Sequence, residues 1–400
     1  MEVTQARPRE STESARSAFW NTWLHALRQV LPVYIAVHLA LLVITCLSVL
    51  FTIGDFSTTP VPLSKLWSGW TRYDAAHYAS IAMRGYYDKT HTAFFPLYPL
   101  LEHILTFIVK DPYAAGFIIS NGAGLIMLVV LYQLVLEDFD HERALRTVLY
   151  LSLFPTAFFF VAAYTESLFL CLSLLCFYAM RHARWWLAGV FGLLACLTRS
   201  TGLFLFFPLC YEYLRWRHFR WRAIRVDVLS IAFVPLGLGL YSLYCFLHFH
   251  DWLAFSHVQA VWDRRLMVPW WGIEESLLTI RHSPGILSYL TLHNLLDLGP
   301  DLFILFCILL GFIGPWRLPR MLWSYAIYAL AVYIFIQCFP IHWPAYPVQS
   351  FARYMLSIFP AFIVLATAGK HRTIHLSYLL IAGGTLFFLV TQYLTGHVVI

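Results

Sequence analysis

Long apolar stretches separated by short polar loops dominate the chain. Most of them have the length that a membrane-crossing helix needs, about 17–25 residues. They lie near 30–53, 113–136, 147–163, 228–250, 298–314, 322–339, 353–369 and 374–396. Turn signals near 181–184 and 199–202 divide a further apolar stretch, 165–214, into about three shorter crossings. The pattern predicts an all-α polytopic membrane protein with a bundle of about eleven transmembrane helices.

The composition supports this class of protein. Of the 400 residues, 60% are hydrophobic and only 12% are charged, whereas a soluble domain carries about 25% charged residues. So little charge excludes a soluble globular enzyme, and the high apolar content excludes collagen, a coiled coil and a disordered chain. All eight cysteines fall within apolar runs, so we expect buried thiols rather than disulfide bonds.

The positions of Lys and Arg orient the predicted helices, because basic loops stay on the cytoplasmic side. The N-terminal segment 1–29 is basic and is expected to be cytoplasmic, and 30–400 form a single transmembrane domain. The run 94–110 contains Pro96 and Pro99, and a full crossing there would invert every later loop. We therefore expect it to lie at the outer interface or to be re-entrant. The expected outside loops are 54–112, 164–167, 199–202, 251–297 and 340–352.

The first outside loop combines aromatic rings with ionisable groups. If it is one helix, Trp67, Trp70, Asp74, His77 and Tyr78 share a single stripe. Aromatic rings suit the apolar face of a sugar, and a carboxylate beside them can accept a proton from a hydroxyl. The alternative interpretation is an interfacial aromatic belt with a solvated carboxylate. The residue types alone leave both interpretations open.

Three further charged residues are expected at the same face of the membrane. Glu166 lies in a very short loop, where Thr165 or Glu166 itself would commonly cap the next helix. Arg199 and Arg353 lie at helix ends, where an arginine usually extends to the lipid headgroups. The functional alternative is that these two cations hold a lipid phosphate. The loop 251–297 adds Trp, Arg and His residues that suit a lid or an acceptor surface, without individual roles.

Three segments, in this order, resemble the PIG-V type GPI mannosyltransferase II family, including its bacterial relatives. The first runs from Trp-Thr-Arg-Tyr-Asp-Ala-Ala-His-Tyr at 70–78 through Gly-Tyr at 85–86 to Ala-Phe-Phe-Pro-Leu-Tyr-Pro at 93–99. The second spans 154–169 and contains Tyr-Thr-Glu-Ser, and the third is Thr-Arg-Ser-Thr-Gly at 198–202. Beyond residue 210 only hydropathy and the region around 353–354 are similar. The order of the three motifs carries the resemblance, because each alone is weak.

The resemblance implies a GT-C glycosyltransferase fold with membrane-parallel helices in the first extracytoplasmic loop. Such enzymes transfer mannose with inversion from a polyprenyl- or dolichyl-phosphate mannose donor, here to a hydroxyl of a lipid-linked or glycan acceptor. By motif position, Asp74 corresponds to the catalytic acid and Glu166 to the second acid. The implied location is a bacterial plasma membrane, or the endoplasmic reticulum of a eukaryote, with the site on the extracytoplasmic face. The addition of the second mannose to a GPI precursor is not carried over, because the later loops match no GPI-specific pattern.

These arguments lead to a set of expected roles. Asp74 is the general base, and His77 orients it. Arg353 and Arg199, with Tyr354, bind the donor phosphate, whose negative charge grows as it leaves. The predicted sugar- or acceptor-binding residues are Trp67, Trp70, Tyr78 and Tyr164.

Two alternatives from other classes remain at this point. A lipid or sugar transporter, or flippase, predicts internal repeats and ionisable residues at the bilayer midplane. A non-catalytic subunit of a larger complex predicts that Asp74 tolerates replacement. The sequence contains no phosphate-binding loop, dinucleotide motif or HExxH metal motif, so neither a cofactor nor a nucleic-acid partner is predicted.

Overall fold

The computed structural model of the protein describes residues 12–52 and 62–397. These residues form helices joined by short turns, and the β-type contact among them is an isolated bridge between Arg264 and Ile341. The α-helices are α1 (Thr12–Thr52), α2 (Leu63–Ser68), α3 (Asp74–Arg84), α4 (Leu97–Val109), α5 (Pro112–Asp138), α6 (His141–Ser152), α7 (Glu166–Arg181), α8 (Trp185–Thr198), α9 (Phe206–Trp216), α10 (Phe233–Phe249), α11 (Ala254–His257), α12 (Trp271–His282), α13 (Tyr289–Phe312), α14 (Trp323–Gln337), α15 (Phe351–Tyr354), α16 (Phe359–Ala368) and α17 (Arg372–Thr395). The 3₁₀ helices are η1 (Gly69–Thr71), η2 (Lys89–Ala93), η3 (Ala157–Phe160), η4 (Ser200–Leu205), η5 (Trp221–Ala223), η6 (Val226–Ala232), η7 (Val258–Trp262), η8 (Arg320–Leu322) and η9 (Met355–Ser357).

Six helical stretches within 12–52 and 62–397 are long and apolar enough to cross a membrane. They are Trp20–Leu50, Pro112–Asp138, Val226–Phe249, Tyr289–Phe312, Arg320–Gln337 and Arg372–Thr395. A seventh is obtained if the pair Phe351–Ser357 and Phe359–Ala368, bent by 83°, counts as one span. The prediction of an all-helical, multi-pass membrane protein is confirmed, while the full set of eleven crossings stays a prediction.

The apolar stretch 165–214 forms three short helices, α7, α8 and α9, which the turn signals predicted. The stretch 147–163, by contrast, is not one long helix, and that prediction is wrong. Helix α6 ends at Ser152, and the chain continues through turns and η3. Pro155 explains the end of the helix, because proline has no N–H for the helical hydrogen bond and disfavours a helical residue before it. The irregular segment 153–165 is nevertheless buried, and it leads directly to Glu166.

Helix α13 begins at Tyr289, well before the predicted start at 298, so the loop expected at 251–297 is shorter. The hydroxyl of Ser288 caps the helix by accepting a hydrogen bond from the Thr291 amide at 3.2 Å. Hydropathy missed this first half because it contains Asn294 and Asp297. Both side chains are buried against other parts of the protein, and each forms at least one hydrogen bond there.

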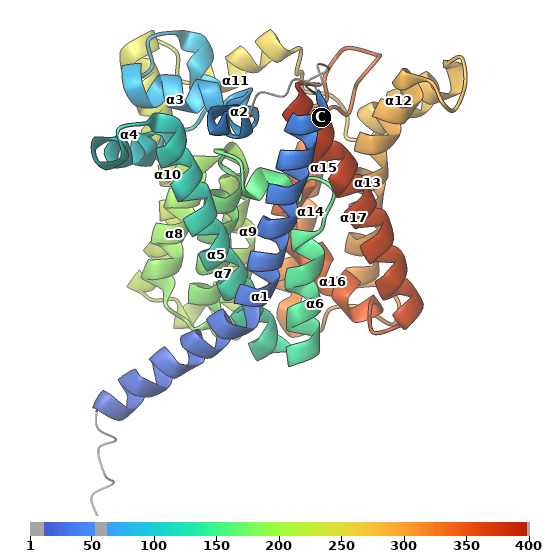
Figure 1. The fold of residues 1–400 in the computed structure, drawn as a ribbon. Helices are drawn as coiled ribbons and strands as arrows, with labels where there is room; N and C mark the ends of the chain where they lie inside the picture. The colour runs from blue at the N-terminus through green and yellow to red at the C-terminus, as the bar shows by residue number, and fades with distance from the viewer. Residues whose placement is uncertain (1–11, 53–61, 398–400) are drawn as a thin grey trace, which may run out of the picture.

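The expected outside loops gather at one end of the bundle. Figure 1 shows α2, α3, α4, α11 and α12 at the upper end, whereas the N-terminal part of α1 projects from the lower end. Helix α4 lies at the upper end beside the beginning of α5 and does not run through the bundle. The position of these helices relative to a membrane stays a prediction.

A buried ion-pair network joins four helices at the other end. Arg181 on α7 pairs with Asp138 at the end of α5 and with Glu212 on α9, the latter at 3.1 Å. The Tyr325 hydroxyl on α14 donates to Asp138 at 2.6 Å. Because buried charges need partners, this network fixes α5, α7, α9 and α14 relative to one another.

Glycines allow α8 and α10 to pack closely. A Cβ on Gly237 of α10 would lie 2.6 Å from the carbonyl oxygen of Leu193 on α8. A Cβ on Gly239 of the same helix would meet nothing within 4 Å. The two glycines lie on the same helix, but only a side chain at position 237 would collide with α8.

We expect Gly237→Ala to lower the free energy of unfolding by about 1–3 kcal/mol, because the new methyl group must push two backbones apart. Gly239→Ala is the matched control and should leave the stability unchanged or slightly higher. All eight cysteines are free, as expected, and several are buried. A thiol-reactive fluorophore therefore reports thermal unfolding in detergent. Equal melting temperatures for the two variants would contradict the close packing of α8 and α10.

Candidate active site

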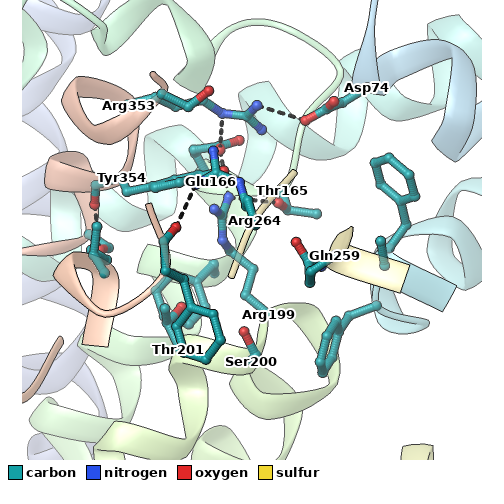
Figure 2. A pocket seen from close by; sticks show the side chains of 18 of the residues that line it. Asp74, Thr165, Glu166, Arg199, Ser200, Thr201, Gln259, Arg264, Arg353 and Tyr354 are labelled. Carbon is teal, nitrogen blue, oxygen red and sulfur yellow. Dashed lines mark hydrogen bonds and ion pairs between the residues drawn. The ribbon is translucent and has the colours of Figure 1, made fainter. Parts of the chain in front are cut away.

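A cavity of about 640 Å³ lies where the upper loops meet the helix bundle. The segments that line it include the start of α3, the irregular segment before α7, η4, η7, the loop before α15, and α15 itself. Figure 2 shows that charged side chains from distant parts of the chain point toward one another in this cavity.

Asp74 is the first residue of α3, and it faces the cavity. Tyr73 precedes it with φ +54°, a conformation that breaks the chain direction between η1 and α3. The Oδ2 atom of Asp74 accepts a hydrogen bond from Nη1 of Arg353 at 2.6 Å. Its side chain remains 30% exposed, so a ligand in the cavity can reach this carboxylate.

Glu166 is the first residue of α7 and is buried. Its Oε1 atom accepts hydrogen bonds from Nε of Arg353 at 2.6 Å and from Nη1 of Arg199 at 2.5 Å. The Thr165 side chain forms no capping hydrogen bond to this helix. The capping interpretation is therefore wrong, since Glu166 binds two arginines instead. Its Oε2 atom is buried and has no hydrogen-bond partner among the described residues.

Arg353 bridges the two carboxylates, and Figure 2 shows it between Asp74 and Glu166. Its guanidinium also lies 4.6 Å from the ring centroids of both Phe159 and Tyr164. Cation–π contacts of this kind are strongest where water is excluded. The headgroup interpretation is wrong for Arg353 and Arg199, because both guanidinium groups point into the protein.

Arg264 comes from the loop without predicted individual roles, and its side chain lines the cavity. It donates hydrogen bonds to the carbonyl oxygens of Phe339 at 2.9 Å and Gln349 at 3.1 Å. Its guanidinium lies 5.3 Å from the ring of Tyr354, and that of Arg199 lies 5.4 Å from the same ring. Within the part of the chain that the structure describes, no ion pair joins Arg264 to a carboxylate. It thus brings an uncompensated positive charge to the cavity.

Two of the predicted aromatic residues, Tyr78 and Tyr164, line the cavity. The Tyr78 hydroxyl lies 3.4 Å from Oγ1 of Thr165, and the Tyr164 hydroxyl donates to the carbonyl oxygen of Arg72 at 3.1 Å. Burial, with a contribution from Asp74, raises the pKa of Tyr78 above its usual value. The Tyr78 hydroxyl therefore stays protonated and can donate a hydrogen bond at neutral pH.

The predicted single stripe in the first loop is wrong. The break at Tyr73 separates α2 and η1 from α3, so the two tryptophans do not share a face with Asp74. Trp67 packs on Phe117 with ring centroids 4.5 Å apart, and Trp70 donates to Oγ1 of Thr45 at 3.3 Å. Neither tryptophan lines the cavity.

His77 also lies outside the cavity lining, on the exposed side of α3. It stacks on Phe94 at 4.7 Å, and the side chain hydrogen-bonded to Asp74 is Arg353. Burial and the neighbouring His77 lower the pKa of His91, whose ring lies 5.7 Å away. Within the described ranges, no group of three or more His, Cys, Asp or Glu residues is arranged to hold a metal ion.

Replacing Glu166 by Ala should lower the free energy of unfolding by about 3–5 kcal/mol, because it leaves buried arginines without their shared carboxylate. The control is Glu142→Ala, which removes an exposed partner of Arg146 and should cost about 0–1 kcal/mol. Thermal and chemical unfolding in detergent measure both effects. If the two variants lost the same stability, the bridging role of Glu166 would be refuted.

Comparison with known proteins gives a consistent set of sequence relatives. A family model described as dolichyl-phosphate-mannose-protein mannosyltransferase matches residues 90–247. GPI mannosyltransferase 2 of Schizosaccharomyces pombe is 26% identical over 300 residues, which are 69% of this chain and 61% of that protein. The protein of the same name from Cryptococcus neoformans is 32% identical over 161 residues, 37% of this chain and 38% of that one. The chain therefore spans less than two thirds of the length of these relatives.

Solved structures with a similar arrangement of helices share little sequence with this chain. ArnT from Cupriavidus metallidurans in the apo state has a TM-score of 0.48 and 14% identity, covering 88% of this chain and 62% of that one. The oligosaccharyltransferase of Archaeoglobus fulgidus in the apo form has a TM-score of 0.43 and 12% identity, covering 92% and 56%.

The sequence matches include the second and third motifs. Glu166 and Arg199 fall within the region of the family model, whereas Asp74 and Arg353 lie outside it. The relatives named above confirm the resemblance that the motifs indicated. The chain is therefore similar in sequence to the GPI mannosyltransferase 2 proteins and, over residues 90–247, to the dolichyl-phosphate-mannose-protein mannosyltransferase family.

Proposed function

We propose that the protein is an inverting glycosyltransferase that moves a mannosyl, or related hexosyl, unit from a polyprenyl- or dolichyl-phosphate donor to an acceptor hydroxyl. The acceptor is a lipid-linked or glycan molecule at the extracytoplasmic face of the membrane. The observation that carries the proposal is the bridge of Arg353 between Asp74 and Glu166 at one cavity. The mannosyltransferase relatives support the type of reaction.

Asp74 is the general base in this proposal. One of its oxygens binds Arg353, and the carboxylate faces the cavity with part of its surface open. The acceptor hydroxyl gives its proton to this carboxylate while its oxygen attacks the anomeric carbon. The bond from that carbon to the phosphate oxygen breaks on the opposite side, and the phosphate leaves with the electron pair. A single base without an enzyme nucleophile gives inversion at the anomeric carbon.

The leaving phosphate gains negative charge during this step, so it needs fixed cations. Arg353 and Arg199 supply positive charge, which they share with Glu166. Arg264 adds a further charge, which forms no ion pair with a carboxylate within residues 12–52 and 62–397, and two backbone carbonyls fix its position. We therefore assign the donor phosphate to the region beside Tyr354, which two of these guanidinium groups flank.

An apolar part of the cavity suits the lipid of the donor. The residues that line this part are Leu203 and Phe204 of η4, Leu238 of α10, Phe335 of α14, and Phe339, which follows α14. Phe335 packs on both Phe204 and Phe339, with ring centroids 4.7 and 5.0 Å apart. These aromatic rings offer an isoprenoid chain a hydrophobic path that starts at the charged residues.

The proposed topology has about eleven crossings, with α7, α8 and α9 among the shorter ones. The N-terminus is cytoplasmic, and the cavity opens on the extracytoplasmic side of a bacterial plasma membrane or an endoplasmic reticulum membrane. The gathering of the predicted outside loops at one end supports this orientation, as do the basic loops of the sequence. The transporter alternative is not favoured, because the sequence relatives are mannosyltransferases.

Asp74→Asn should reduce turnover by about 10²–10⁴-fold, because the amide cannot accept the proton of the acceptor hydroxyl. The assay is transfer by the purified enzyme from a polyprenyl-phosphate mannose donor, with folding checked by thermal unfolding. Glu142→Gln removes a carboxylate that is 78% exposed on α6 and should retain full activity. Near-normal turnover of a folded Asp74→Asn protein would mean that Asp74 is not the base.

Arg264→Gln should weaken the binding of donor and of polyprenyl phosphate by about 10–100-fold, the value of a hydrogen bond to a charged group. Its neighbour Arg265 is exposed, so Arg265→Gln tests charge removal without loss of a cavity contact. The donor KM and inhibition by polyprenyl phosphate are the measurements. Equal effects of the two substitutions would place the phosphate elsewhere.

A further inference from the structure

The four-residue helix α15 carries Arg353 and Tyr354, yet its own sequence does not supply its N-terminal cap. The first amides of any helix lack acceptors within the helix and must find them elsewhere. Ser350 precedes α15 with φ +73°, and its hydroxyl forms no capping hydrogen bond. The backbone that aims Arg353 therefore depends on groups outside α15.

Asp297 of α13 supplies the missing acceptor. Its Oδ1 atom accepts a hydrogen bond from the amide of Ala352, the residue before Arg353, at 3.4 Å. Asp297 is 1% exposed, and Oδ1 is the atom of its carboxyl group that accepts this hydrogen bond, while Oδ2 has no hydrogen-bond partner among the described residues. Asp297 thus caps α15 from a different helix.

The same residue, Ala352, is also held through its carbonyl group. The Thr156 hydroxyl, in the irregular segment before α7, donates to the carbonyl oxygen of Ala352 at 3.0 Å. One turn before Asp297, Asn294 donates to the carbonyl oxygen of Ala345 at 2.8 Å and fixes the loop that leads into α15. The direction of the Arg353 side chain thus follows from buried contacts of Ala352 with two other parts of the fold.

We propose that Asp297 is a positioning residue that sets the orientation of Arg353 by capping α15, an inference that rests on the proposed role of Arg353 in transfer. Arg353 must reach Asp74 and Glu166, the first residues of α3 and α7, with hydrogen bonds of 2.6 Å to each. Without the cap, the amide of Ala352 loses its acceptor and α15 loosens. The guanidinium then no longer faces the leaving phosphate in a fixed geometry, and the rate of transfer falls.

The test compares Asp297→Ala with Asp297→Asn, because the asparagine oxygen can still accept the amide hydrogen bond. In Asp297→Ala, hydrogen exchange in the peptide containing 350–354 should become at least about tenfold faster, and kcat should fall by at least about tenfold. The donor KM should change by less than about threefold, because Arg264 and the lipid path remain. Asp297→Asn should restore both exchange and kcat to within about threefold of the original protein.

The matched control is Asp301→Ala, one turn further along α13. Asp301 is equally buried but bonds to Gln337 and Tyr333 of α14, so its loss should leave exchange at 350–354 unchanged. In an Arg353→Lys background, Asp297→Ala should lower kcat by no more than about twofold, because its effect passes through Arg353.

Three results would overturn the proposal: equal losses in the Ala and Asn variants, unchanged exchange at 350–354 in Asp297→Ala, or a full additional loss in the Arg353→Lys background. Hydrogen exchange needs no substrate, so it separates this proposal from the proposed function. Faster exchange in Asp297→Ala, restored by Asn, would support the capping even if Arg353 proved unnecessary for transfer. If Arg353 proved unnecessary for transfer, the link between the cap and catalysis would be refuted.

Discussion

Arg353 carries a positive charge at a place from which water is largely excluded, and the upper end of the fold is arranged around that charge. Its guanidinium satisfies Asp74 and Glu166 and lies against the rings of Phe159 and Tyr164. A buried charge is tolerated only when it is paired and hydrogen-bonded, so the segments that carry these partners must meet here. The first loop, the segment before α7 and the helix α15 are therefore brought together by one electrostatic requirement.

The charged groups of the site form ion pairs with one another but can still interact with a ligand. Glu166 keeps one buried oxygen without a hydrogen-bond partner in the described part of the protein, and Asp74 presents its carboxylate to the cavity. Arg264 donates hydrogen bonds to two backbone carbonyls and lies over the ring of Tyr354, and no carboxylate among the described residues forms an ion pair with it. Charge that develops in a transition state is stabilised by groups that are already fixed in place and can still form hydrogen bonds, because such groups need not reorganise during the reaction. The ion pairs at the opposite end differ in this respect, since both oxygens of Asp138 and both oxygens of Glu212 have hydrogen-bond partners there.

Backbone contacts hold the cations of the site as much as ion pairs do. Arg264 is fixed by carbonyl groups of the loop before α15 and by its bridge to Ile341. Ala352 is fixed through its amide by Asp297 and through its carbonyl by Thr156. Buried polar residues in the spans thus act as supports for the short irregular segments that carry the site. This role explains why the polar residues Asn294 and Asp297 lie in the first half of α13, before the start that hydropathy predicted.

The sequence by itself determined the membrane class of the protein and the gathering of Asp74, Glu166, Arg199 and Arg353 at one end. It did so because charge is scarce in this chain, so each charged residue outside the basic loops stood out. Only the tertiary structure decided how these charges are used. The break at Tyr73 removed both tryptophans from the cavity, since a local backbone angle is invisible to helical periodicity, whereas His77 lies on α3 itself and faces away from the cavity. Arg264 and Asp297 acquire their roles from hydrogen bonds to backbone groups far along the chain, and no local pattern records such contacts.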